Sequence, residues 1–155
     1  MEKVKVLFWS KKNEDGKDIQ DMKFATQHSA AVDLKVVDDV TISSKSYKVI
    51  STGLYVSIPD GYYMKVFPRS GISAKTDLIF KNTVGIIDSD YRGREIFIMY
   101  YNLGNNDITF NKGERVAQAI IEKLIPVEYV PVSSIDDLKS DGFDRGGGLG
   151  HTGKF

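Results

Sequence analysis

Short runs of apolar and β-branched residues, separated by turn residues, recur along most of the chain. Clear examples are residues 4–9, 47–50, 53–59, 62–67 and 95–102. Runs of this length that are rich in Val, Ile, Tyr and Phe predict β-strands, and the Gly, Pro, Asn and Asp residues between them predict turns. Many short strands at such spacing predict an all-β subunit, either a jelly roll or another β-barrel.

Helical patterns are few and short. Residues 70–75 and 133–138 are candidates for short helices, and neither segment is long enough to carry a core. From about residue 140 the apolar pattern is lost, and glycines crowd residues 144–153. A glycine-dense stretch is entropically costly to order, so this end of the chain is predicted to be a flexible tail.

The length of 155 residues suits one domain with a single hydrophobic core. We therefore expect a β-barrel domain over residues 1–139 and a C-terminal tail or lid over residues 140–155. Acidic and basic residues balance at 21 each, so the chain has no global basic field that would attract nucleic acid. Any polyanion that it binds must be held by a local cluster of charges.

The chain contains no cysteine, which excludes a disulfide framework, a thiolate zinc site and a cysteine nucleophile. The N-terminal residues do not form a cleavable apolar leader, and no run is long and apolar enough to span a bilayer. We expect a soluble cytoplasmic protein that acts neither on membranes nor directly on nucleic acid.

The segment 85–93 places two carboxylates, Asp88 and Asp90, and the Tyr91 ring at a strand-to-turn junction. Such a junction is able to expose a catalytic carboxylate in a cleft. The alternative is an ordinary turn in which both aspartates accept hydrogen bonds from the nearby backbone.

The segment 68–71 combines the Arg69 guanidinium, the Ser70 hydroxyl and the small Gly71 at the start of a predicted helix. These groups suit a phosphate, although a capped helix start with a surface arginine fits equally well. Two polar residues also lie inside apolar strands: Asp33 within residues 30–34 and Gln118 within residues 113–121. Both need partners if they are buried, and these partners are either structural groups or a ligand.

The order of these segments is more specific than any one of them. Residues 31–34, 68–71, 82–93 and 113–118, followed by a glycine-rich tail from Arg145, resemble the five-motif signature of the trimeric dUTP pyrophosphatase (dUTPase) family. The resemblance runs from about residue 29 to residue 153. It implies a jelly-roll subunit, a homotrimer whose active sites are shared between subunits, and Mg²⁺-dependent hydrolysis of dUTP to dUMP and pyrophosphate. That reaction limits uracil in DNA and supplies dUMP for dTMP synthesis.

The resemblance also implies roles for single residues near the reacting atoms. Asp88 matches the aspartate that activates the attacking water, and Tyr91 matches the ring that packs against the deoxyribose. Asn82 matches the position that reads uracil, with nearby backbone. Asp33 matches an acidic residue in the outer water shell of the metal. Because triphosphate and water supply most ligands of Mg²⁺, no cluster of metal ligands is expected in the sequence.

The phosphate contacts implied by the resemblance come from the strands and from the tail. Arg69, Ser70, Gly71 and Gln118 match phosphate contacts, and Arg145 matches the tail arginine that reaches the terminal phosphate. In the tail, Leu149 and Thr152 are also expected to contact the substrate. Leu149 stands where the family commonly has an aromatic residue, and the tail motif is one residue shorter than usual.

Two other functions remain open at the level of sequence. A dCTP deaminase resembles a dUTPase in fold and assembly, although the segment from Asp88 to Tyr91 favours hydrolysis. A nucleotide-gated protein that binds a protein partner is the other alternative. A full set of phosphate-binding and water-activating groups would be superfluous in a pure binding module, so we favour the enzyme.

Overall fold

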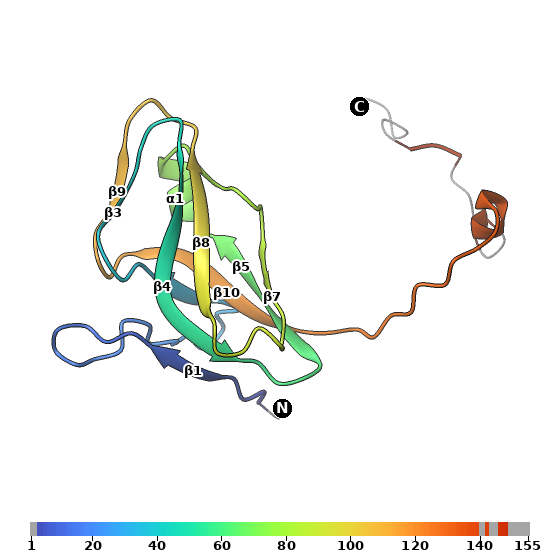
Figure 1. Cartoon of the computed structure of the whole chain (residues 1–155), viewed down its shortest axis with the longest axis horizontal. Coiled ribbons are helices and arrows are strands. Elements are labelled where there is room, and N and C mark those ends of the chain that lie inside the picture. Colours follow the sequence, from blue (N-terminus) through green and yellow to red (C-terminus); the bar gives the residue numbers. More distant parts are fainter. Residues whose placement is uncertain (1–2, 140–141, 143–145, 149–155) are drawn as a thin grey trace. The chain divides into compact units, whose positions relative to one another are not determined.

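The computed structural model describes residues 3–139, 142 and 146–148, and it divides the chain into two units, Met1–Ile125 and Pro126–Phe155. The predicted substrate contacts Arg145, Leu149 and Thr152 therefore lie outside the described residues. The first unit is built from β-strands with one short helix, which confirms the predicted all-β class (Figure 1).

In the described part of the chain, antiparallel strands form two four-stranded sheets and one strand pair. The first sheet has the order β1 (Leu7–Ser10), β4 (Tyr47–Ser57), β8 (Glu95–Asn102) and β6 (Leu78–Phe80). The second has the order β2 (Val32–Lys35), β10 (Arg115–Lys123), β5 (Tyr62–Pro68) and β7 (Gly85–Ile87). The pair consists of β3 (Val40–Ile42) and β9 (Ile108–Phe110). Two packed antiparallel sheets of this size are the jelly-roll arrangement.

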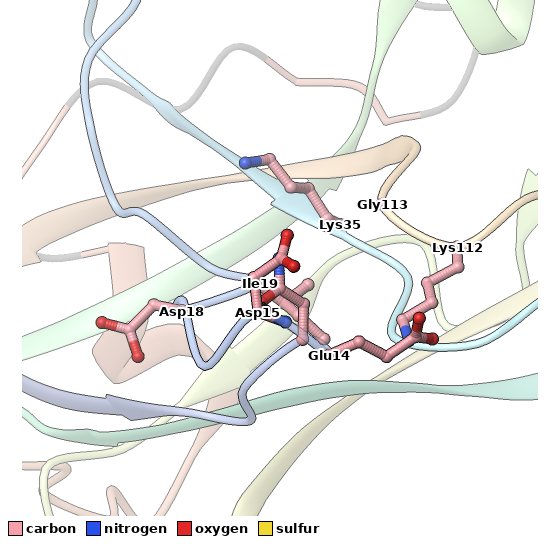
Figure 2. Close-up of a pocket in the computed structure, with 8 residues that line it drawn as sticks. Glu14, Asp15, Asp18, Ile19, Lys35, Lys112 and Gly113 are labelled. Atoms are coloured by element: carbon pink, nitrogen blue, oxygen red, sulfur yellow. Dashed lines mark hydrogen bonds and ion pairs between the residues drawn. The ribbon is translucent and has the colours of Figure 1, made fainter.

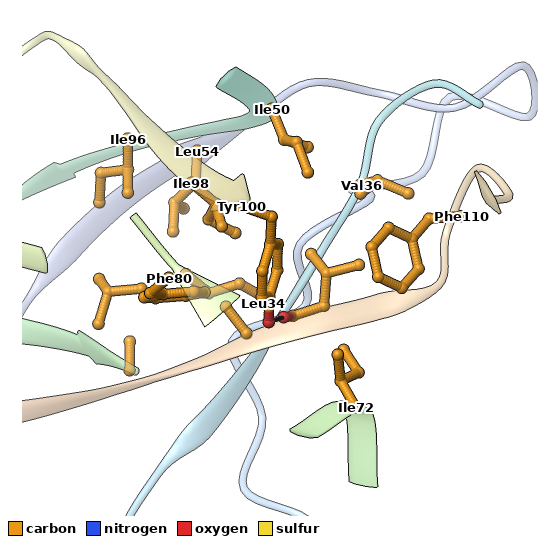
Figure 3. Close-up of a cluster of buried hydrophobic side chains, with 14 of the residues drawn as sticks. Leu34, Val36, Ile50, Leu54, Ile72, Phe80, Ile96, Ile98, Tyr100 and Phe110 are labelled. Carbon is orange, nitrogen blue, oxygen red and sulfur yellow. Dashed lines mark hydrogen bonds between the residues drawn. The ribbon is translucent and has the colours of Figure 1, made fainter. Parts of the chain in front are cut away.

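One hydrophobic core joins the two sheets because alternate side chains of each strand point inward. Strand β8 contributes Ile96, Ile98 and Tyr100, and these meet Leu34 of β2 in a single cluster (Figure 3). Strands β4, β5 and β10 contribute to the same cluster, which contains Ile50, Leu54, Val56, Met64, Val66, Val116, Ala117 and Ala119. The helix α1 (Ser70–Lys75) adds Ile72 to this cluster.

The two predicted strands 47–50 and 53–59 are one strand, β4, with an irregularity between Ser51 and Tyr55. Gly53 lies in this irregularity with a φ of 57°, in the left-handed region that glycine adopts without strain. A Cβ at Gly53 would lie 2.7 Å from the Lys11 Cβ and 2.8 Å from the Val37 Cγ1. The turn-like residues of the sequence therefore mark a β-bulge, not the end of a strand.

Both predicted helices are present, one as an α-helix and the other as a 3₁₀-helix. Helix α1 spans residues 70–75 as expected. The second candidate is a 3₁₀-helix, η1 (Ile135–Lys139), which begins two residues later than predicted and has no buried residue. It lies in the second unit, where residues 126–132 have no regular secondary structure.

Within the described residues, neither helix approaches the length and apolarity that crossing a membrane requires.

The buried Tyr100 hydroxyl offers a test of the core. It donates a hydrogen bond of 2.7 Å to the Val116 carbonyl, and burial raises the pKa of Tyr100, so the hydroxyl stays protonated. Tyr100→Phe should lower the free energy of unfolding in urea by about 1–3 kcal/mol, because a buried carbonyl loses its donor.

Tyr101→Phe is the matched control for this measurement. Its hydroxyl makes an exposed bond to the Lys45 carbonyl, so the change should stay within about 0.5 kcal/mol. Equal effects of the two substitutions would show that the buried bond contributes no more than an exposed one.

Candidate functional site

The polar residues predicted inside apolar strands lie side by side on the second sheet. In the register of β2, β10 and β5, Asp33 pairs with Gln118, and Gln118 pairs with Phe67. All three are half-buried, whereas Leu34 and Ala117, their neighbours along the strands, are fully buried. The period of two along each strand therefore places Asp33 and Gln118 together on the face that is turned away from the core.

Asp33 is held by two arginines, which explains how an apolar strand accommodates a carboxylate. One carboxylate oxygen lies 2.9 Å from Arg69 Nε, and the other lies 3.6 Å from Arg115 Nη1. Arg69 also donates a hydrogen bond of 3.4 Å to the carbonyl of Arg115. Two guanidinium groups around one carboxylate leave a net positive charge, which suits a phosphate.

Sequence reasoning gave no role to Arg115, the second arginine of this cluster. Its position two residues after Gly113, at the start of a predicted strand, did not by itself indicate a neighbour. The contact follows from the pairing of β10 with β2, in which Arg115 is opposite Lys35, two residues from Asp33. A correct strand register would have revealed the contact.

The segment from Arg69 to Gly71 lies beside this cluster because strand β5 ends at Pro68 and helix α1 begins at Ser70. The Gln118 amide donates a hydrogen bond of 2.9 Å to the Pro68 carbonyl and so fixes the end of β5. Ser70 and Gly71 are exposed, and nothing lies within 4 Å of where a Cβ of Gly71 would be. The structure thus brings together four predicted phosphate contacts, Arg69, Ser70, Gly71 and Gln118.

The hairpin between β6 and β7 carries Asn82, which is exposed. Thr83 has a φ of 66°, and the Val84 amide donates a hydrogen bond of 2.7 Å to the Asn82 carbonyl, so the turn is tight. A left-handed conformation is costly for a β-branched residue such as Thr83. Asn82 is therefore presented on a constrained turn.

Asp88 follows the last residue of β7 and is exposed. The Tyr91 amide donates a hydrogen bond of 3.2 Å to the Asp88 carbonyl, which closes a turn that holds the two residues close together. The Tyr91 hydroxyl donates a bond of 2.9 Å to the Glu95 carbonyl. Arg92 stabilises the same loop through bonds to the Ser89 carbonyl at 2.7 Å and to Asp60 at 2.6 Å.

The two halves of the predicted site lie at opposite ends of β5. Ile87 pairs with Met64, so Asp88 is next to the start of β5, whereas Arg69 follows its last residue. At ~3.3 Å per residue, the six residues from Tyr63 to Arg69 separate the two groups by about 20 Å. A single chain therefore does not bring Asp88 and the arginine cluster to one phosphate.

A pocket of about 430 Å³ opens next to β2, and its charges are mixed (Figure 2). Lys35 and Lys112 line it, together with acidic side chains of the loop that contains Glu14 and Asp18. Lys112 pairs with Glu14 at 3.2 Å, and Lys35 pairs with Asp21 at 3.1 Å. Three carboxylates, Glu14, Asp15 and Asp18, outnumber the two lysines in this lining, whereas two arginines share one carboxylate in the cluster around Asp33. The pocket therefore suits a triphosphate less well than the arginine cluster does.

Comparison with known proteins identifies the family of the chain. The family model of the dUTPases matches residues 17–153. A deoxyuridine 5'-triphosphate nucleotidohydrolase of Finegoldia magna is 41% identical over 134 residues, which cover 84% of this chain and 90% of that protein. One from Caldanaerobacter subterraneus is 34% identical over 152 residues, which cover 97% of this chain and 99% of that protein.

Solved structures show the same fold. The crystal structure of a dUTPase from Streptococcus mutans has a TM-score of 0.70 at 28% identity, covering 79% of this chain and 98% of that one. A dUTPase mutant of Staphylococcus bacteriophage 80alpha, solved with dUpNHpp, has a TM-score of 0.79 at 22% identity, covering 96% and 98%. The chain therefore belongs to the dUTPase family, whose members hydrolyse dUTP to dUMP and pyrophosphate.

Proposed function

We propose that this dUTP diphosphatase uses Asp88 as the general base for attack of water on the α-phosphorus of dUTP. The observation that carries the proposal is the position of Asp88, an exposed carboxylate one turn away from Tyr91 at the end of β7. A carboxylate in this position is able to accept a proton from water.

The reaction balances without a covalent intermediate. Asp88 accepts a proton as the water oxygen bonds to the α-phosphorus, and the bond from that phosphorus to the oxygen bridging to the β-phosphate breaks. Pyrophosphate leaves and dUMP remains. Arg69 and Arg115 are placed to offset the developing negative charge, while Ser70 and Gln118 donate hydrogen bonds to phosphate oxygens.

The nucleoside is read by the hairpin and by the loop that follows it. We assign Asn82 to uracil and the Tyr91 ring to the deoxyribose. The Tyr91 hydroxyl is engaged by the Glu95 carbonyl, so its ring is held in place and leaves no room for a 2′-hydroxyl. This assignment distinguishes the protein from a ribonucleotide hydrolase.

Magnesium fits the residues present if the substrate supplies most of its ligands. The described residues contain no group of three or more His, Cys, Asp or Glu side chains that could hold a metal ion. A cation bound by three phosphates and water needs no such group. When bound, Mg²⁺ would neutralise phosphate charge; Asp33, which is 25% exposed, would accept a hydrogen bond from a metal-bound water. The dUTPase of phage phi11 coordinates a structural Mg(II) ion.

A homotrimer with shared sites resolves the separation of Asp88 from the arginine cluster. If one subunit supplies Asp88 and a neighbour supplies Arg69, the distance of about 20 Å within a chain is no obstacle. An apolar outer face on the first sheet supports assembly. Tyr47, Val49, Ile79 and Phe97 are 51%, 50%, 47% and 49% exposed, respectively. Exposed apolar side chains on adjacent strands mark a surface that a partner covers.

The alternatives from the sequence are less well supported. The curated relatives named above are dUTP hydrolases, not dCTP deaminases.

We assign the C-terminal tail as the third segment of each site, with Arg145, Leu149 and Thr152 as its contacts to the substrate. We propose that it closes over the bound triphosphate.

The first prediction tests the base. Asp88→Asn should lower kcat by roughly 10²–10⁴, because the amide cannot accept the proton, and should leave the Kd for dUpNHpp nearly unchanged. Pyrophosphate release and calorimetric titration measure the two quantities. Asp90→Asn is the matched control, since Asp90 is an exposed carboxylate in the same turn, and its kcat should change less than tenfold. A larger loss in Asp90→Asn than in Asp88→Asn would transfer the role to Asp90.

The second prediction concerns Asp33 and the metal. Asp33→Asn should raise the Mg²⁺ concentration for half-maximal activity by about tenfold, because a hydrogen bond from a metal-bound water to a charged oxygen is weakened. Asp21→Asn, which affects a carboxylate paired with Lys35, is the control and should not change it. If Asp33→Asn changes only the KM for dUTP at saturating Mg²⁺, Asp33 acts by positioning Arg69 and Arg115 and has no role at the metal.

The third prediction tests shared sites by complementation. Asp88→Asn and Arg69→Ala trimers, each nearly inactive, are unfolded together and refolded as mixed trimers. If each site takes Asp88 and Arg69 from different chains, about a quarter of the sites in a random mixture regain both groups, and activity rises accordingly. The two variants refolded separately are the controls. Activity no higher than in those controls would place both residues of a site on one chain.

A further inference from the structure

Two side chains, Glu95 and Thr52, bind the β-bulge of β4 to strand β8. Across the bulge, Ser51 is opposite Phe97 and Tyr55 is opposite Glu95, so β4 contains two residues more than β8 over the same stretch. The extra residues remove the regular strand pairing of Gly53. The Glu95 carboxylate replaces it: one oxygen accepts a hydrogen bond of 2.8 Å from the Gly53 amide and a second from the Ser51 hydroxyl.

The bulge is itself anchored in the core, so Glu95 is attached to a rigid part of the molecule. Thr52 is fully buried, and its hydroxyl donates a hydrogen bond of 2.5 Å to the Ile96 carbonyl. The fully buried Gln20 amide donates bonds of 2.7 Å to the carbonyls of Thr52 and Lys35, which joins the bulge to β2. Satisfied buried networks of this kind hold one backbone geometry.

The backbone carbonyl of Glu95 also binds the Tyr91 side chain. The Tyr91 hydroxyl donates its bond to the Glu95 carbonyl, four residues away at the start of β8. A continuous path of hydrogen bonds therefore runs from the bulge through the Glu95 side chain and carbonyl to the Tyr91 ring. The loop has a separate support in Arg92, which contacts Ser89 and Asp60.

We propose that Glu95 is a positioning residue that sets the discrimination between deoxyribonucleotides and ribonucleotides. Its carboxylate is bound to the bulge at Gly53, and this fixes the Glu95 carbonyl that holds the Tyr91 hydroxyl. The proposal rests on the assignment of Tyr91 to the sugar. A ring excludes a 2′-hydroxyl only if it cannot retreat, and a shift of ~1 Å is enough to admit an extra oxygen. Glu95 does not touch the substrate; it acts by fixing the carbonyl to which Tyr91 is bound.

The test is the ratio of kcat/KM for dUTP to kcat/KM for UTP in the full-length enzyme. Glu95→Ala should lower this ratio by about tenfold, mainly through a gain in kcat/KM for UTP, because the loss of a charge-assisted bond frees the ring. Glu95→Gln retains an oxygen that accepts from Gly53 and should keep the ratio within about twofold. A lower thermal stability alone would not move the ratio, so the readout separates positioning from folding.

Two further variants keep the test decisive if Glu95→Ala folds poorly. Ser51→Ala removes only one of the two donors to the carboxylate, and Tyr91→Phe removes only the bond to the Glu95 carbonyl. Both should lower the ratio. Asp107→Ala is the matched control, because it removes a carboxylate that accepts a backbone bond of 2.9 Å from Ser44, and it should leave the ratio unchanged.

A double-variant cycle decides whether Glu95 acts through Tyr91. In a Tyr91→Ala background, Glu95→Ala should have no further effect on the ratio. An equal effect in both backgrounds, or an unchanged ratio in all the Glu95 and Ser51 variants, overturns the proposal while leaving the role of Tyr91 intact. If Tyr91→Ala alone leaves the ratio unchanged, the sugar assignment and the proposal both fail. The Asp88→Asn variant tests the hydrolytic mechanism independently of the sugar assignment and of the Glu95 proposal.

Discussion

The antiparallel register of β5 with β10 and β7 is the constraint on which the rest of the site depends. This strand ends next to the segment proposed to bind phosphate, and its first residues pair with the last residues of β7, after which Asp88 lies. Because β7 runs opposite to β5, the two functional groups are directed to opposite ends of the sheet. No rotation of side chains closes a gap of about 20 Å, so in the proposed trimer the topology of this one sheet links assembly to catalysis.

A second consequence of this sheet is that a carboxylate is retained in an apolar strand. Asp33 alternates with Val32 and Leu34, which are buried in the core. Its burial is offset by Arg69, which follows the last residue of β5, and by Arg115, the first residue of β10. Because both arginines are already paired with Asp33, their side chains are held in place before the proposed phosphate binds. This arrangement lowers the cost of ordering two long side chains on binding.

The bulge in β4 shows a similar relation between a local irregularity and a functional loop. A regular strand would have needed no Gly53 and no carboxylate at Glu95. The irregular backbone creates an amide that needs an acceptor, and the residue that satisfies it also begins the strand behind Tyr91. Bulges next to functional sites commonly direct a side chain, and here the directed group is the ring proposed to face the sugar.

The sequence by itself determined the all-β class, the short helix after Arg69 and the family, because these depend on the period of apolar residues and on the order of short motifs. It also indicated that Asp33, if buried, needs a cation or hydrogen bonds, since the cost of burying a charge is a local requirement. Tertiary structure decided which cations these are, that residues 47–57 form one bulged strand, and that Arg115 belongs to the cluster. It also decided that Asp88 and Arg69 lie apart. Strand register joins residues far apart in the chain, and local patterns carry no information about which strands pair.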